Sequence, residues 1–213
     1  MKTETMLVTG HQFNDKINKN AMYFRRAASL TTNNMNEVYN IGMSDHLPVW
    51  TWYEEVQVYN NESLLVQYWY SDADVVYMNP YSEEMFCGLG NLISIDLSRF
   101  NASKVVDISG MFHGCKSLIM LNVSNWDTSN VEHMSKAFCG CESLQILDLS
   151  GWSTSKVLGM SFMFCDCIRL ETLNLSNFDM SMVQHTHRMF ENVRPSSIAH
   201  PSKENTTVSS YQS

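Results

Sequence analysis

Hydrophobic positions between residues 85 and 193 recur with a period of 26 residues. One recurring set is aromatic throughout and consists of Phe100, Trp126, Trp152 and Phe178. Two further sets keep the same period, namely Phe86, Phe112, Phe138, Phe164 and Phe190, and Leu97, Val123, Leu149 and Leu175. Because unrelated segments would not share one period in several sets at once, this pattern predicts an internal repeat array.

Each repeat unit predicts a short strand, a turn and a short helix. In the unit that starts at Leu118, the first part ends with apolar residues on alternate positions, Leu121 and Val123, as in a strand with one buried face. The polar run 127–130 is typical of turns and helix N-caps. Val131, Met134 and Phe138 follow at i, i+3 and i+7, which predicts one apolar stripe of a short helix.

Units of this size cannot bury their apolar faces alone. Successive units are therefore expected to stack as a solenoid, with the short strands forming a parallel ladder and equivalent side chains in contact. The aromatic set offers a direct check, because Trp126 and Trp152 should then lie side by side.

The residue composition changes at three points along the chain and so divides it into four segments. These segments are 1–47, 48–84, 85–193 and 194–213. The first segment is polar, with an amphipathic helix predicted over 13–30. The second is aromatic and β-branched and predicts a hairpin of strands 49–59 and 63–70, which would cap the repeat array. The last is Ser-, Pro- and Thr-rich with little apolar content and is predicted to be a disordered tail.

Composition and charge narrow the class of protein. The 213 residues include 14 Lys and Arg against 22 Asp and Glu, a formal net charge of −8. Nucleic-acid binders usually carry a basic footprint, so no nucleic-acid partner is expected. No apolar run approaches the ~18 residues of a membrane-spanning helix, and the mean hydropathy of −0.21 suits a soluble chain. The first ten residues resemble no secretory signal, and no anchor is recognised.

The six cysteines lie on the same 26-residue grid. One set consists of Cys115, Cys141 and Cys167, and the other of Cys87, Cys139 and Cys165, with His113 at the equivalent position of the intervening unit. The repeat alone explains this spacing, and structural zinc sites usually place two to four residues between paired ligands. We therefore expect free thiols, the alternative being an adventitious disulfide or metal.

No catalytic, cofactor-binding or metal-binding residues are predicted, and the protein is not expected to be an enzyme. The chain has no glycine-rich phosphate loop, no His-Glu-x-x-His and no nucleophile elbow. His185 and His187 fall on variable positions that we interpret as exposed to solvent. Asp127 and Asp179 lie where helices are predicted to begin, so N-capping is their expected role.

A partner-binding face is predicted on the exposed side of the strand ladder. Its residues are Ser94, Asp96, Met120, Asn122, Ile146, Asp148, Thr172 and Asn174. Repeat arrays present such extended faces to macromolecules, and the neighbouring apolar residues Met120 and Ile146 would be unusual without a partner. A protein partner is expected, with no cofactor.

The repeat motif resembles that of the BspA-like leucine-rich-repeat surface proteins, whose 26-residue repeats are also known from mycoplasma lipoproteins. Residues 125–141 and 151–167 follow the pattern (N/G)-(W/F)-D-T-S-x-V-x-x-M-x-x-M-F-x-x-C, and 99–115 follows it more loosely. The turns at 101–103 and 153–155 lack its Asp. The resemblance implies an α/β fold, a leucine-rich-repeat-like solenoid preceded by an α+β N-terminal cap.

The same resemblance implies the function. We expect a non-enzymatic bacterial protein, displayed on the cell surface or secreted, that mediates protein binding or cell adhesion through the array face. One alternative is an intracellular or fragmentary scaffold with the same fold. Another is a carbohydrate-binding module that uses the aromatic hairpin residues Trp50, Trp52, Tyr53, Tyr68, Trp69 and Tyr70.

Overall fold

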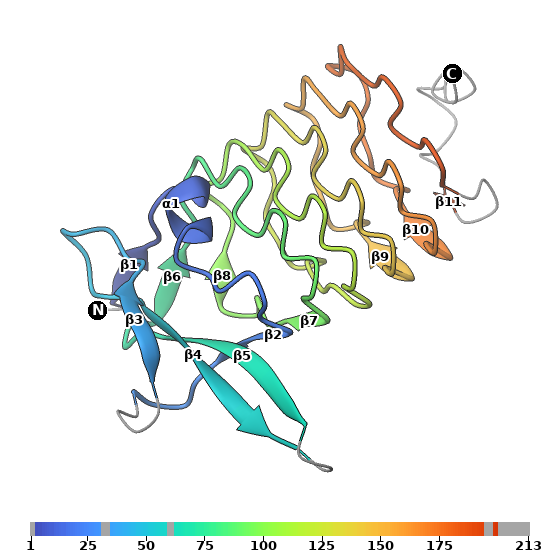
Figure 1. The fold of residues 1–213 in the computed structure, drawn as a ribbon. Coiled ribbons are helices and arrows are strands. Elements are labelled where there is room, and N and C mark those ends of the chain that lie inside the picture. Colours follow the sequence, from blue (N-terminus) through green and yellow to red (C-terminus); the bar gives the residue numbers. More distant parts are fainter. Residues whose placement is uncertain (1–2, 31–34, 59–61, 194–197, 200–213) are drawn as a thin grey trace.

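The computed structural model describes residues 3–30, 35–58, 62–193 and 198–199. Figure 1 shows a β-rich N-terminal part followed by a row of similar backbone units. The predicted disordered tail, 194–213, lies outside the described residues except for one short strand at 198–199.

The described part of the chain has one helix and eleven short strands. In chain order they are β1 (Glu4–Met6), α1 (Gly10–Asn14), β2 (Tyr23–Arg26), β3 (Asn36–Asn40), β4 (Trp50–Gln57), β5 (Ser63–Tyr70), β6 (Val75–Tyr77), β7 (Ser94–Ile95), β8 (Phe100–Asn101), β9 (Ile146–Asp148), β10 (Thr172–Asn174) and β11 (Ile198–Ala199). They form sheets in the orders β3-β4-β5-β2-β7, β1-β6-β8 and β11-β10-β9.

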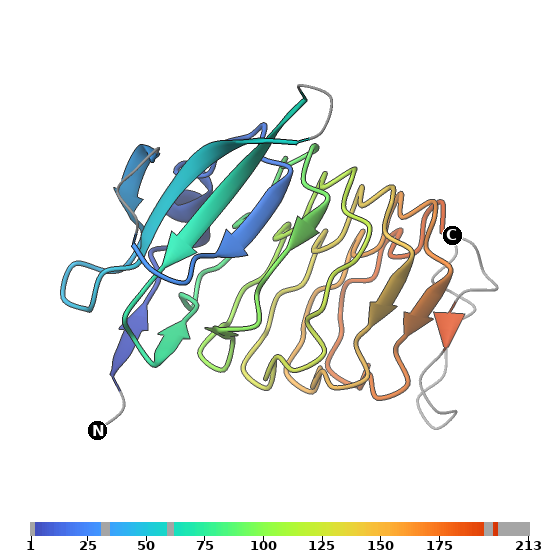
Figure 2. The same cartoon turned by 90° about the horizontal axis from the view of Figure 1, so that it is seen from below.

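The predicted hairpin forms, as β4 and β5 pair antiparallel from Trp50 opposite Tyr70 to Gln57 opposite Ser63. Strand β2 lies between β5 and β7 and runs parallel to both, so it joins the hairpin to the first repeat unit. Figure 2 shows β2, β7, β9 and β10 along the same side of the molecule.

The helix predicted over 13–30 is wrong in extent, because the observed helix α1 ends at Asn14 and β2 occupies part of the same stretch. Backbone hydrogen bonds on both sides of this stretch explain the outcome. The N–H of Met22 donates to the carbonyl of Leu65 in β5, and the N–H of Ile93, in the first repeat unit, donates to the carbonyl of Met22. Phe24 is fully buried between them. Tertiary pairing thus outweighs a helical pattern whose intrinsic preference is weak.

Equivalent residues of neighbouring units lie beside one another throughout the repeat array, residues 85–193. Parallel backbone bridges join Asp107 to His133, His133 to Gly159 and Gly159 to His185. The expected contact between Trp126 and Trp152 is confirmed, with ring centroids 6.3 Å apart and planes inclined by 9°.

The predicted fold class is nevertheless wrong. No described residue of the repeat array is helical, and the described sheets mix parallel and antiparallel pairs around turn-rich connections. Over its described residues the molecule is a mixed-β protein with almost no helix, and not a leucine-rich-repeat-like solenoid of strands and short helices.

Left-handed residues explain why the predicted helices do not form. Lys136, inside the stretch expected to be helical, has φ 59°. An α-helix needs right-handed residues and bonds within its own segment. The N–H of Phe138 instead donates to the carbonyl of Met163 in the next unit at 2.9 Å. The apolar i, i+3, i+7 stripe therefore marks buried turn positions rather than a helix face.

These left-handed positions themselves recur every 26 residues. One set consists of Glu84, Gly110, Lys136, Phe162 and Arg188, and the other of Gly88, Gly114, Gly140, Asp166 and Asn192. Glycine adopts this conformation without steric cost, and Asn and Asp tolerate it better than most residues. The second set therefore has residue types suited to its backbone.

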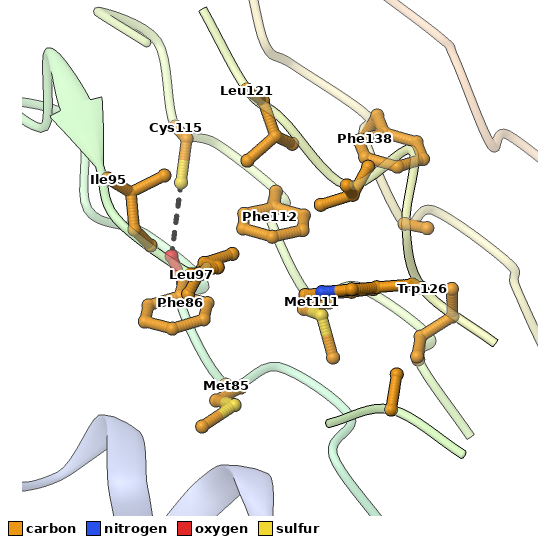
Figure 3. Close-up of a cluster of buried hydrophobic side chains, with 14 of the residues drawn as sticks. Met85, Phe86, Ile95, Leu97, Met111, Phe112, Cys115, Leu121, Trp126 and Phe138 are labelled. Carbon is orange, nitrogen blue, oxygen red and sulfur yellow. Dashed lines mark hydrogen bonds between the residues drawn. The ribbon is translucent and has the colours of Figure 1, made fainter. Parts of the chain in front are cut away.

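The core is a column of stacked aromatic rings that runs along the array. Phe86, Phe112, Phe138 and Phe164 are at most 1% exposed, and successive centroids lie 5.4 to 5.7 Å apart. Figure 3 shows Phe112 between Phe86 and Phe138, with Trp126 beside it. Because each large ring is buried by its equivalents in the next units, the array is held together unit by unit.

Candidate functional site

The predicted face brings four of its eight residues into one row. Parallel pairing joins Ser94 to Met120, Met120 to Ile146 and Ile146 to Thr172. We call these four residues the strand face. Met120 is 69% and Ile146 58% exposed, whereas Leu121 and Leu147, one position on, are buried. This alternation is that of a strand with one buried and one open side.

The other four predicted residues form a second row, two positions further along each unit, and have a structural role. Asp96, Asn122, Asp148 and Asn174 each accept the backbone N–H of the serine two residues later, at distances of 3.0 to 3.3 Å. These are Asx turns, in which a side chain replaces a backbone acceptor. The row therefore holds the turns beside the strand face.

The Asx turns also set the charge of the row. The backbone and hydroxyl of Ser150 hydrogen-bond the Asp148 carboxylate and lower the pKa of that carboxyl below its ordinary value. Asp148 is exposed and ionised at neutral pH, so it adds negative charge beside Ile146.

Sequence reasoning missed a shallow depression of about 470 Å³ beside the strand face. Its apolar wall consists of Met22, Ile93 and Ile119, and Gln145 and Arg169 supply polar groups. The 26-residue spacing of Ile93 and Ile119 was a signal for part of it, since both lie one position before strand-face residues. Met22 comes from the N-terminal segment, which no repeat pattern could place there.

The aromatic hairpin offers less exposed ring surface than its sequence indicated. Trp52 and Trp69 are each 1% exposed. The Trp52 ring stacks on Tyr68 at 5.8 Å, and Trp69 packs against Phe100 of the first unit at 4.6 Å. Both tryptophans thus stabilise the sheet and its junction with the array.

The cysteines of one set have a repeated structural contact. The Sγ atoms of Cys115, Cys141 and Cys167 lie 3.1 to 3.2 Å from the carbonyl oxygens of Phe86, Phe112 and Phe138, respectively. Figure 3 shows the first of these bonds. Burial raises the pKa of the Cys115 and Cys167 thiols to about 12, so these thiols stay protonated and unreactive at neutral pH. None of the six cysteines, all of which are described, forms a disulfide.

The remaining candidate residues are placed as follows. His185 and His187 are both exposed, as expected. The N-capping role of Asp127 and Asp179 is wrong, because no helix follows them. Each instead accepts the N–H of a serine two residues on, at 3.0 and 2.9 Å, in the same type of Asx turn.

Comparison with known families assigns the chain. Residues 81–201, more than half of the sequence, match the model of a family described as "Mycoplasma protein of unknown function, DUF285". The chain belongs to this family. The DUF285 match begins at Tyr81, whose bridge to Asp107 is the first of the 26-residue backbone bridges. The resemblance to mycoplasma repeats is thereby confirmed at the level of this family.

Searches of curated proteins and of solved structures gave no match for this DUF285 protein. Among the described residues, no helix is both long and apolar enough to cross a membrane.

Proposed function

We propose that this DUF285 protein is a non-enzymatic binding protein of bacterial surface type, which attaches to proteins on host or neighbouring cells through the strand face. One observation carries the proposal. Met120 and Ile146, 69% and 58% exposed, are paired side by side on adjacent units of a regular array. The resemblance of the repeats to BspA-like surface proteins supports the cellular role.

The energetics favour a protein partner at this position. Burying apolar surface contributes about 25 cal/mol per Å², and methionine is enriched at the centres of protein interfaces. The two side chains are flanked by the polar Asx-turn row on one side and by the shallow depression at Ile119 on the other. An apolar centre with a polar border is the usual composition of such an interface.

The test is attachment of the purified, fluorescently labelled protein to cultured animal epithelial cells. The wild-type chain should bind saturably, and trypsin treatment of the cells should abolish binding because the receptor is a protein. Met120→Lys and Ile146→Lys together should weaken binding at least about tenfold, since two charges in a desolvated interface cost more than one hot-spot contact.

Met182→Lys is the matched control. Met182 is 52% exposed but lies outside the strand face, and the equivalent positions 104 and 156 already carry lysine. This variant should bind like the wild type. Equal attachment of the double variant and the wild type would refute the assigned surface, and non-saturable or trypsin-resistant attachment would refute a protein receptor.

A further inference from the structure

A second line of side chains on the array consists entirely of residue types that bind metals. Its members, one per unit, are Cys87, His113, Cys139, Cys165 and Glu191. Cys115, Cys141 and Cys167 contact carbonyl oxygens, whereas Cys165 of this line lies next to carboxylate oxygens. The C-terminal end of this line brings two thiols together with two carboxylates.

The ligand atoms at this end converge. The Sγ atoms of Cys139 and Cys165 and a carboxylate oxygen of Asp166 lie within 4.8 Å of one another. Cys165 Sγ is 3.4 Å from Asp166 Oδ2 and 3.6 Å from Glu191 Oε2. In a tetrahedral zinc site with Zn–S of about 2.3 Å and Zn–O of about 2.0–2.2 Å, ligand atoms are about 3.4–3.8 Å apart. The two spacings at Cys165 therefore fit a tetrahedral site. The remaining ligand atoms would have to approach one another when an ion binds, because only Cys139, Cys165 and Asp166 form the group within 4.8 Å.

Neighbouring residues hold each carboxylate in a fixed orientation. Asn192 donates its side-chain amide to Oδ1 of Asp166 at 2.6 Å, which leaves Oδ2 directed at the thiol. Arg188 lies 3.6 Å from Oε1 of Glu191, while Oε2 of the same carboxylate faces Cys165. Outer residues that orient ligands in this way are a regular part of protein metal sites.

Accessibility suits an ion that enters from solvent. Cys139 and Cys165 are 8% and 5% exposed, so their sulfur atoms are largely shielded. Asp166 and Glu191 are half-buried and form the open side of the cluster. The two thiols favour a borderline-soft cation over Mg²⁺ or Ca²⁺, which prefer oxygen ligands alone.

We propose that Cys139, Cys165, Asp166 and Glu191 bind one divalent cation of the zinc class. Each thiol loses its proton to solvent when the ion binds, and the ion is held by two sulfur and two oxygen atoms. Because the ligands come from three successive units, the bound ion clamps the last described units of the repeat array to one another. No redox step is involved.

The experiment uses the purified full chain, reduced and stripped with a chelator, and Co²⁺ as the spectroscopic probe. One Co²⁺ per chain should give the visible absorption of a tetrahedral site together with a thiolate charge-transfer band. One equivalent of Zn²⁺ should displace it, whereas Mg²⁺ should not. Zn²⁺ at about 100 times its dissociation constant should raise the folded-to-unfolded ratio about 100-fold in urea titrations.

Variants identify the ligands. Cys165→Ser should remove the charge-transfer band or weaken binding at least about tenfold. Asp166→Asn should also weaken Zn²⁺ binding. This variant keeps the test valid if the serine variant does not fold, because Asn192, at the equivalent left-handed position of the next unit, shows that asparagine is tolerated there. Cys87→Ser, on the same line but outside the cluster, should bind like the wild type.

The absence of stoichiometric binding, a Co²⁺ spectrum with no thiolate band, or unchanged affinity in Cys165→Ser would each overturn the proposal. A Cys139–Cys165 disulfide found by mass spectrometry in freshly isolated protein would likewise overturn it, since the sulfur atoms would then be unable to bind the ion.

Discussion

At the scale of single residues, some buried side chains at recurring positions hydrogen-bond the backbone of the next unit as well as filling space. Thr128 and Thr154 are buried, 2% and 1% exposed, and each hydroxyl both donates to and accepts from one residue of the next unit. The partners are Ser153 and Asp179, respectively. These hydroxyls replace a ladder hydrogen bond where no strand exists.

Replacing Thr128 by valine tests this role. The change keeps the shape of the side chain but leaves the N–H and C=O of Ser153 without their partner, both at 2.9 Å in the wild type. We expect the free energy of unfolding to fall by about 1–3 kcal/mol in urea denaturation. Thr172→Val, at an exposed strand position, should change it by no more than about 0.5 kcal/mol. Similar losses in both variants would show that the Thr128 hydroxyl has no special role.

Alanine substitutions at two nearby glycines can distinguish backbone strain from steric clash as the reason for glycine. Gly88 has φ 74° and a Cβ there would meet nothing within 4 Å, while Gly90 is outside the left-handed region and has similar room. Gly88→Ala should destabilise the protein by about 1 kcal/mol, because alanine resists a positive φ. Gly90→Ala should be neutral or stabilising by about 0.4–1 kcal/mol, because it restricts the unfolded chain. Thermal unfolding of both variants provides the comparison, and the opposite order would contradict a strained position at 88.

At the scale of elements, the parts foreseen from sequence are those whose partners lie nearby in the chain. The β4–β5 hairpin forms because its two strands are rich in aromatic and β-branched residues and lie close together in the chain. The helix predicted over 131–138 fails because its stabilising bonds go to a unit 26 residues away. The recurring glycines at 88, 114 and 140 were the available signal, but a glycine also ends helices, so the local pattern fitted both structures.

The Asx turns make the turn elements sensitive to acid. Side-chain and backbone hydrogen bonds from serines lower the pKa values of Asp127 and Asp179, and those to Asp148 act in the same direction. A carboxyl whose pKa is lower in the folded state contributes stability above its unfolded pKa of about 3.9, and this contribution is lost as the pH falls through the folded value. Unfolding free energy should therefore decrease on going from pH 6 to below pH 4.

The matched variant replaces Asp127, Asp148 and Asp179 by asparagine, the residue already present at positions 122 and 174. Asparagine keeps the acceptor of the Asx turn and cannot titrate. The triple variant should lose less stability than the wild type between pH 6 and pH 3 in parallel urea titrations. An identical acid response would assign the effect to other carboxylates.

At the scale of the whole molecule, the candidate site shows the same division between local and distant information. The row of Ser94, Met120, Ile146 and Thr172 follows from the 26-residue period alone, because equal spacing places equivalent residues side by side. The depression next to it required Met22 from the N-terminal segment, and the thiol–carboxylate cluster required the rotamers of Cys165 and Asp166. Neither a contact between dissimilar segments nor a side-chain orientation is encoded in a repeat pattern.

The stacked aromatic column makes stability depend on position along the molecule. Phe138 is fully buried between Phe112 and Phe164, 5.7 Å from each, whereas Phe190 is half-buried and, among the described rings, stacks only on Phe164. In an array of nearest-neighbour contacts, a central defect removes two interfaces and a terminal defect only one. Phe138→Ala should therefore cost about 3–5 kcal/mol of unfolding free energy, and Phe190→Ala clearly less.

Hydrogen exchange shows where each defect acts. Phe190→Ala should increase amide exchange in the last unit while the N-terminal sheet stays protected, because terminal units can open locally. Phe138→Ala should increase exchange in the units on both sides of the central position and lower the urea midpoint of the whole chain. If the two variants lost equal stability and exchanged uniformly, the repeat array would unfold as a single cooperative block, and the column of rings would act on the molecule as a whole rather than unit by unit.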